Sequence, residues 1–200
     1  MWLGFARIGT DRLLLVGVSG LGVATLISVL VNVADVFYVL EDIGASASAY
    51  GLVTALWPAA GVLGGWYAGR LSGDTVLTRW LAGTTVAVGL ALVAAGSVVS
   101  IVAVGVGWLI GGAANTAQRV CLNALVRSRT DDAARGRVFS AVSGVLQAGN
   151  LVGLALGASL VGLVGARWSL LGSGAATAVV GLAMFGLVRR RALAPAAGRL

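Results

Sequence analysis

The sequence predicts an all-α, polytopic membrane protein with six transmembrane helices. Of its 200 residues, 58% are hydrophobic and only 10% are charged, whereas about 25% of the residues of a soluble domain are charged. The mean hydropathy is +0.98, and the apolar residues form six long runs separated by short polar segments. Each run is close to the roughly 20 residues needed to cross a bilayer core as a helix.

The six predicted spans follow these runs in chain order. The first run is longer than the 7–15 apolar residues of a signal peptide, so it is interpreted as an uncleaved first helix. Residues 1–12 are then a cytoplasmic segment, 13–188 the transmembrane domain and 189–200 a basic cytoplasmic tail. The predicted spans are Leu13–Leu40, Tyr50–Ala68, Trp80–Ser97, Ile101–Leu125, Val138–Val164 and Trp168–Val188.

The arginines predict the orientation of the chain. All positive side-chain charge comes from arginine, because the sequence contains no lysine and no histidine. Every arginine except Arg119 and Arg167 lies before the first span or after the second, fourth or sixth, whereas the first loop on the opposite side carries Glu41 and Asp42. The positive-inside rule therefore places both termini in the cytoplasm and predicts a multi-pass protein of the cell membrane.

The composition also argues against several function classes. Without histidine, and with Cys121 as the single cysteine, the chain offers no disulfide, no cysteine-based metal site and no His-activated nucleophile. The spans carry no paired carboxylates, so we expect neither an enzyme nor a cofactor. The arginines lie between apolar runs and not on a basic, aromatic-rich surface, so the expected partner is the lipid bilayer and not nucleic acid.

Polar residues recur at helical spacing in three of the predicted spans. Steps of three and four residues place each set on one face of its helix, and polar groups are costly in lipid unless they face protein or water. Spans 13–40, 101–125 and 138–164 are therefore expected to line an interior, and spans 80–97 and 168–188 to face lipid. Interhelical hydrogen bonding with no substrate nearby is the alternative. The candidate cavity-lining residues are Ser28, Asn32, Asp35, Asn115, Arg119, Asn123, Ser143, Gln147 and Asn150.

Two of these residues are charged. Asp35 is the only acid within the proposed spans, which makes it the candidate proton or cation site. It also lies about 33 Å along its helix from Leu13, which fits an interfacial or gating role. Arg119 lies about 27 Å from the outer start of its helix. Arg119 can either extend to the cytoplasmic surface or bind an anionic group. For each of these two charged residues, the sequence leaves both roles open.

Small residues predict close packing on two helices. Four-residue spacing of glycine allows helix backbones to approach each other in lipid. Pro58, in the middle of the second span, is expected to kink that helix, either as a static bend or as part of a gate. The glycines at this spacing are Gly61, Gly65 and Gly69 in the second span, and Gly149, Gly153 and Gly157 in the fifth.

Several motifs occur in an order and at a spacing that extend over nearly the whole chain. They are Asn-Val-Ala-Asp-Val-Phe-Tyr-Val at 32–39, Ala-Tyr-Gly-Leu at 49–52, Gly-Val-Leu-Gly-Gly at 61–65 and Arg-Gly-Arg-Val-Phe-Ser at 135–140. With the opening segment at 4–14, they resemble the C-terminal six-helix half of major facilitator superfamily transporters. The closest similarity is to the drug and siderophore exporters common in actinobacteria. The resemblance implies one half of that fold, a 3+3 inverted repeat whose first, second, fourth and fifth helices border the cavity.

The resemblance also implies roles for the basic and acidic loop residues. The segment from Gly69 to Asp74 is similar to a loop pattern of the family, with the acid displaced and the Gly-Arg-Arg end missing. Asp74, Arg135 and Arg137 are therefore candidate gating residues, and whether Asp74 still latches a cytoplasmic gate is left open.

The family has twelve helices around a site between two halves. We therefore expect this chain to act as half of a secondary transporter, paired with a second six-helix half that is either another copy or another chain. The expected function is proton-coupled export of a small amphiphilic substrate molecule. A non-transporting membrane subunit, or a truncated transporter fragment, is the alternative.

Overall fold

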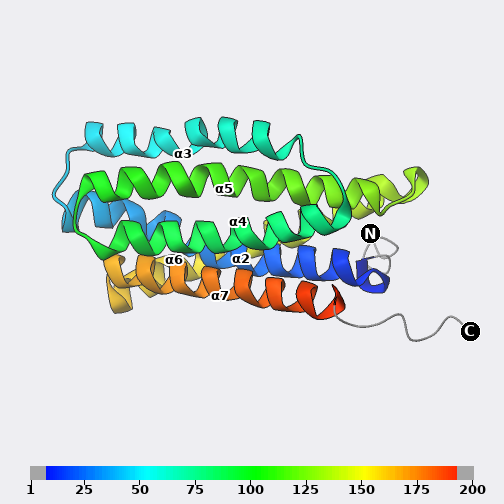
Figure 1. Ribbon diagram of the computed structural model, residues 1–200. Coiled ribbons are helices and arrows are strands. Elements are labelled where there is room, and N and C mark those ends of the chain that lie inside the picture. The colour runs from blue at the N-terminus through cyan, green and yellow to red at the C-terminus, as the bar shows by residue number, and fades with distance from the viewer. Residues whose placement is uncertain (1–7, 193–200) are drawn as a thin grey trace, which may run out of the picture.

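The computed structural model describes residues 8–192, which are almost entirely helical and include six helices long and apolar enough to span a membrane (Figure 1). This confirms the predicted all-α, six-span architecture. Residues 1–7 and 193–200, which include part of the predicted opening segment and most of the predicted tail, lie outside the described residues. The helices are α2 (Arg12–Phe37), continued by the π-helical turn η1 (Tyr38–Asp42), α3 (Ala47–Ala68), α4 (Asp74–Ser97), α5 (Ile101–Ser128), α6 (Asp132–Val164) and α7 (Ala166–Ala192).

Each helix extends beyond the span predicted for it. The predicted starts at Trp80 and Val138 were wrong by six residues, because α4 begins at Asp74 and α6 at Asp132. Arg135 therefore lies within a helix and not in a loop. Hydropathy marks only the part of a helix that suits lipid, whereas the helix ends where its terminal groups are capped. At the start of α3, for example, the Ser46 side chain accepts a hydrogen bond from the backbone N–H of Ala49.

The remaining boundaries need smaller corrections of the same kind. The first helix begins at Arg12, one residue before the predicted span start at Leu13, which agrees with the start of the first apolar span. There the Asp11 side chain accepts hydrogen bonds from the N–H groups of Leu13 and Leu14. The fourth span ends at Ser128 instead of Leu125. The last helix covers Ala166–Ala192 instead of Trp168–Val188, so the first residues of the predicted tail are helical.

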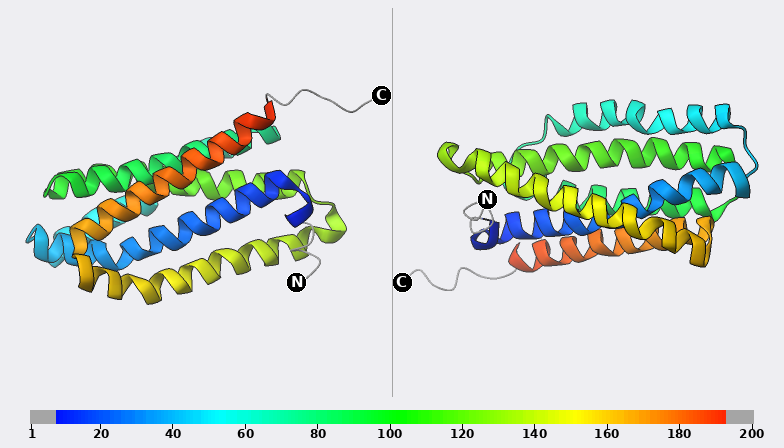
Figure 2. Two further views of the ribbon diagram at one scale, coloured as in Figure 1. Left: turned by 90° about the horizontal axis from the view of Figure 1, so that it is seen from below. Right: turned by 180° about the vertical axis from the view of Figure 1, so that it is seen from behind.

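The helices form an open arc with internal symmetry. Along this arc α3 packs on α5, α5 on α4, α4 on α7, α7 on α2, and α2 on α6 (Figures 1 and 2). Exchanging α2, α3 and α4 for α5, α6 and α7 reproduces the same series of neighbours in reverse. Each helix and its counterpart are three spans apart, so they cross the membrane in opposite directions. This arrangement is a 3+3 inverted repeat.

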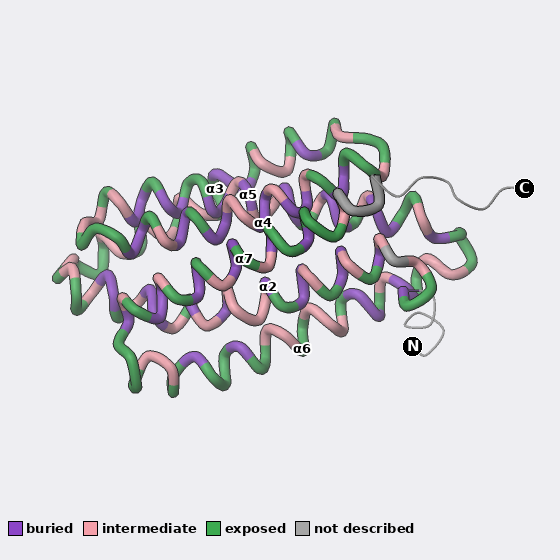
Figure 3. The backbone as a smooth tube through the Cα atoms, turned by 60° about the horizontal axis from the view of Figure 1, so that its bottom comes forward, coloured by how far each residue is buried: buried purple, intermediate pink, exposed green. Residues whose placement is uncertain are grey.

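The middle of the arc is more buried than its two ends (Figure 3). Within the apolar windows of the spans, 56% of the α4 residues are buried, against 11% in α3 and 17% in α6. Span 80–97 was expected to face lipid, yet α4 packs against both α5 and α7. Its tight contact with α7 explains the difference, since a Cβ on Gly174 of α7 would lie 2.8 Å from the N of Val93. Small residues, and not polar ones, determine this contact.

Polar contacts connect the helices at both ends of the bundle. At the arginine-rich end, the Arg129 guanidinium pairs with Asp11 at 2.8 Å and with Asp74 at 2.9 Å. At the opposite end, the Tyr38 hydroxyl and the Arg167 guanidinium donate to backbone carbonyls of residues 95–98. These carbonyls end α4 and lack helical donors. Between the two ends, Gln118 donates to Thr85 at 2.6 Å.

Candidate substrate cavity

A cavity of about 280 Å³ lies among α2, α3 and α5, with one side chain from α4. All of its polar lining comes from the first three of these helices. Its lining residues are Thr25, Ser28, Val29, Val31, Asn32, Asp35, Thr54, Trp57, Pro58, Leu92, Trp108, Asn115 and Arg119.

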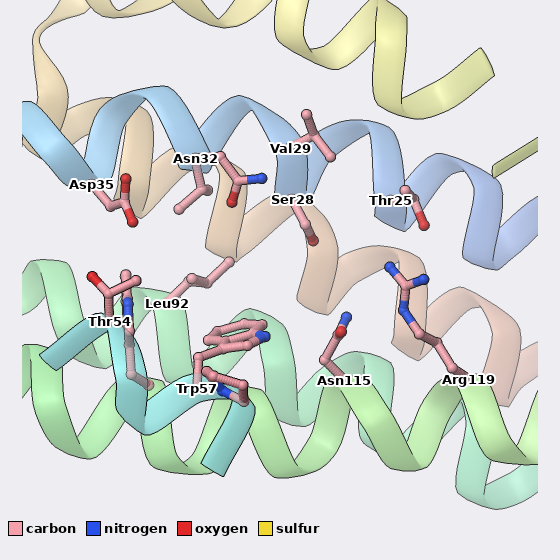
Figure 4. A pocket seen from close by; sticks show the side chains of 13 residues that line it. Thr25, Ser28, Val29, Asn32, Asp35, Thr54, Trp57, Leu92, Asn115 and Arg119 are labelled. Carbon is pink, nitrogen blue, oxygen red and sulfur yellow. The ribbon is translucent and has the colours of Figure 1, made fainter. Parts of the chain in front are cut away.

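Two rows of polar side chains face each other across this cavity. On α2, the row runs from Thr25 to Asp35 in steps of three and four residues, so its members share one face of the helix. On α5, Asn115 and Arg119 are one turn apart and point back toward α2 (Figure 4). The two rows come from helices that are counterparts in the inverted repeat.

Two tryptophans form the apolar wall of the cavity. The Trp57 and Trp108 rings lie edge to face, with their centroids 5.8 Å apart and their planes at 78°. Trp57 can approach α5 because Gly111 and Gly112 have no side chains there. A Cβ on Gly111 would lie 2.6 Å from Trp57 Cζ3, and one on Gly112 would overlap the Trp57 carbonyl.

Oxygen atoms gather around Asp35 at one end of the cavity. The Asp35 side chain is buried, with 8% of its residue surface exposed, and its Oδ1 atom has no hydrogen-bond partner. The Thr54 hydroxyl lies opposite it in Figure 4, and the Tyr50 hydroxyl interacts with both side chains. Because Pro58 lacks an N–H group, the Thr54 carbonyl four residues earlier loses its helical donor. This end therefore presents a carboxylate, a hydroxyl and a carbonyl that are all able to accept hydrogen bonds.

The other end of the cavity carries the opposite charge. Arg119 lies beside Asn115, and its guanidinium points toward Thr25 (Figure 4). It forms no ion pair or hydrogen bond with any residue in the range 8–192. Thr25 and Asp35 are ten residues apart, so the two charged ends are separated by about 15 Å along α2.

The structure brings together five of the nine residues predicted from sequence to line a cavity, namely Ser28, Asn32, Asp35, Asn115 and Arg119. Asn123, Ser143, Gln147 and Asn150 do not line it. The last three lie on α6 at the end of the arc, where Ser143 and Gln147 are exposed.

Sequence analysis did not select Thr54, Trp57 or Trp108 as lining residues. Thr54 is the only serine or threonine in the predicted span Tyr50–Ala68, and a tryptophan in a membrane helix has no periodic signal. Their position in the cavity depends on how α3 docks on α5.

The predicted glycines of α3 and α6 lie in two of the close helix contacts, which we name the α3–α5 seam and the α2–α6 seam. In the α3–α5 seam, a Cβ on Gly61 would lie 2.5 Å from Thr116 Oγ1, and one on Gly65 3.1 Å from Thr116 Cγ2. In the α2–α6 seam, Gly149, Gly153 and Gly157 of α6 all lie against α2. Gly69 differs from the other predicted glycines, since a Cβ there would meet only the backbone of its own helix.

The candidate gating residues do not form one cluster. Asp74 accepts hydrogen bonds from Ser128 at 2.7 Å and from Arg129 at 2.9 Å. Arg135 pairs with Asp132 one turn earlier, and Arg137 donates to the Ala133 carbonyl, so the contacts of both remain within α6. Sequence analysis treated Arg129 only as a topology signal, because its partners are 55 and 118 residues away.

The structure and the comparisons together define the class of this protein. A six-helix membrane bundle that is built as an inverted repeat and contains a polar cavity has the architecture of one half of a secondary transporter. Within residues 8–192, no group of three His, Cys, Asp or Glu side chains could hold a metal ion.

The family model of the Major Facilitator Superfamily matches residues 12–199, so the chain belongs to this superfamily. Its members are transporters and not enzymes. The comparison with curated proteins and the comparison with solved structures each gave no match.

Proposed function

We propose that this chain is one half of a proton-coupled exporter of small amphiphilic molecules, similar to the drug and siderophore exporters, and that a second six-helix half completes its transport path. Membership of the superfamily establishes a transporter. The observation that carries the proposed coupling is the position of Asp35, a buried acid that lines the cavity with one carboxylate oxygen unpartnered.

Asp35 has the features that a coupling site requires. It lies within a span and borders the same cavity that we assign to the substrate, so a proton bound there can influence what the cavity holds. The nearest arginine lining that cavity, Arg119, is at its other end. Asp35 therefore has no cation among the lining residues beside it, and it can exchange a proton without breaking an ion pair.

The exposed ends of the arc support a second half. Exposed apolar side chains of α3 and α6, such as Leu63 and Leu151, do not by themselves require a protein partner, because lipid could cover them. Ser143 and Gln147 on α6 are also exposed. Polar side chains within a span are costly in hydrocarbon, so this face suits a partner or a water-filled path better than lipid.

Proton coupling can be tested in inside-out vesicles that contain the chain and are energised to an acidic interior. Addition of small amphiphiles, with a pH-sensitive dye as reporter, should release protons from vesicles with the wild-type chain. Asp35→Asn should abolish this release, because its side chain cannot take up a proton. Asp42→Asn is the matched control, since Asp42 is exposed in the same helical segment. Equal proton release by wild type and Asp35→Asn would contradict the role of Asp35.

The second half can be tested by native mass spectrometry of the chain extracted from its own host in mild detergent. A homodimer, or a complex with a second six-helix chain, is the expected result. A protein that is monomeric under every mild condition would contradict the proposed pairing and favour a non-transporting subunit.

A further inference from the structure

We infer that the cavity selects molecules with an anionic group and an apolar or aromatic body, and that Arg119 binds the anionic group while Trp57 and Trp108 contact the body. This inference rests on the proposed transport function and assigns its substrate class. The anionic group is a carboxylate, sulfonate or phosphate, all of which present the same oxygen geometry to a guanidinium.

The placement of Arg119 is the first argument. It lies nine residues before the end of α5 at Ser128, or about 14 Å from the arginine-rich end of that helix. Its side chain points across the cavity toward α2 and not along its own helix to the surface (Figure 4). The structure therefore favours the second of the two roles that the sequence left open for this residue.

The charge around Arg119 is the second argument. The Arg119 side chain lines the cavity and is exposed, and an arginine within a membrane span pairs with an acid or a backbone carbonyl or faces water. Asp11 and Asp74 are both paired with Arg129, and Asp35 lies at the opposite end of the cavity. No acid among the described residues pairs with Arg119. The side chains beside it, from Thr25, Ser28 and Asn115, are neutral hydrogen-bonding groups that can assist in binding an oxyanion.

The rest of the cavity determines the form and direction of the bound molecule. Trp57, Trp108 and Leu92 supply an apolar wall. Because Trp57 and Trp108 lie edge to face, an aromatic ring of the ligand can pack beside them as a third ring. The volume of about 280 Å³ equals that of roughly nine water molecules, which suits a small organic ion. The Asp35 carboxylate repels an anion at its own end, so the anionic group of the ligand points toward Arg119.

Equilibrium dialysis with the purified full chain in phosphatidylcholine nanodiscs tests this inference. The probes are 2-naphthalenesulfonate, the neutral 2-naphthol and 2-naphthylmethylammonium, which share one ring system and differ in charge. We expect the wild type to bind the sulfonate at least tenfold more tightly than the other two. Arg119→Gln should reduce the affinity for the sulfonate about tenfold or more and change that for 2-naphthol less than twofold. Arg119→Lys should give an intermediate affinity, because lysine retains the charge but not the planar donor array.

Arg127→Gln is the matched control, since Arg127 lies on α5 near its end and does not line the cavity. It should leave all three affinities unchanged. Circular dichroism and a monodisperse elution profile verify that each variant is folded. Equal binding of the three probes, or a sulfonate affinity that Arg119→Gln does not change, would overturn the inference.

Repeating the measurement with 30% phosphatidylglycerol in the nanodiscs distinguishes a solute from a lipid headgroup. Loss of Arg119-dependent sulfonate binding in these nanodiscs would assign the site to anionic lipid and reject a solute.

This test is independent of transport. Anion binding that depends on Arg119, in a chain that moves no protons, would retain the ligand class and reject the proposed coupling. Asp35-dependent proton movement driven by neutral or cationic molecules only would retain the coupling and reject the ligand class.

Discussion

The α3–α5 seam and the α2–α6 seam occupy equivalent positions in the inverted repeat, yet they are packed differently. In the α3–α5 seam, both helices contribute glycines and the backbones touch. A Cβ on Gly64 would overlap the Ala113 carbonyl, and one on Gly112 would overlap the Trp57 carbonyl. In the α2–α6 seam, α6 supplies the regularly spaced glycines and the approaches to α2 are less close. A Cβ on Gly153 would lie 2.6 Å from the Leu26 carbonyl, and one on Gly149 3.0 Å from the Gly22 carbonyl.

This difference indicates which part of the bundle is rigid. Backbone atoms cannot move aside for an added methyl group, and the α3–α5 seam has the closer backbone approaches. The α3–α5 seam also holds Trp57 in the cavity wall, so the more rigid of the two seams positions the apolar wall of the site. We expect the α2–α6 seam to be the one that adjusts when the arc changes shape.

Gly64→Ala should produce the largest effect of the seam substitutions. The added Cβ would occupy the position of the Ala113 carbonyl and force α3 away from α5. We expect the free energy of unfolding to fall by about 3 kcal/mol, at the upper end of the cost of overpacking. The measurement is the midpoint of thermal unfolding in detergent. Gly51→Ala, on the same helix with no atom near its Cβ position, should be neutral or stabilising by up to about 1 kcal/mol. A loss of equal size at both positions would mean that α3 does not pack as described.

Gly153→Ala should have a smaller effect in the α2–α6 seam. Its Cβ would lie 2.6 Å from the Leu26 carbonyl and 3.0 Å from Val29 Cβ, so α6 must shift away from α2. A loss of about 1.5 kcal/mol is expected by the same unfolding assay. Gly162→Ala, on α6 with open space around it, is the control. A loss as large as that of Gly64→Ala would remove the proposed distinction between the two seams.

The contrast between the seams also shows what a sequence can predict about this fold. The spans, their number and the α6 glycines follow from composition and regular spacing, because lipid imposes length and apolarity on each helix. Gly64 and Gly112, which are in the closest contacts, interrupt the four-residue pattern and were not selected. Their importance depends on which carbonyl of the neighbouring helix they meet, and this is a property of tertiary packing.

The candidate site was predictable to the same degree. The α2 row and the α5 pair were identified because lipid penalises unsatisfied polar groups, so their spacing reports a shared face. The α6 stripe gave an equally strong signal, yet it does not line this cavity. Periodicity shows which residues share a face of a helix, but it does not show what that face meets.

The smallest predicted effect concerns the link between the two seams. Arg129 ends α5 in one seam, and its partner Asp11 caps α2 in the other. Partial burial acts to raise the pKa of the Asp11 carboxyl. The hydrogen bonds from Arg129 and from the N–H groups of Leu14 and Leu13, together with the Arg129 charge, outweigh burial and lower this pKa below its usual 3.8. A carboxyl group with a lowered pKa in the folded state stabilises the fold above pH 3.8, and this contribution is lost as the pH falls through the folded-state value.

Asp11→Asn separates the charge of this residue from its capping role, because asparagine is an equally good N-cap. Both partners are partly exposed, so we expect a loss of under about 1 kcal/mol at neutral pH and low salt. The loss should decrease in 0.5 M salt, where the charges are screened. It should also decrease as the pH falls below 3.8 through the lowered folded-state pKa of Asp11, because wild-type Asp11 then becomes protonated. Arg129→Gln combined with Asp11→Asn should cost less than the sum of the two single changes, since they remove the same ion pair. Strict additivity in the thermal unfolding assay would show that this contact does not connect the two seams.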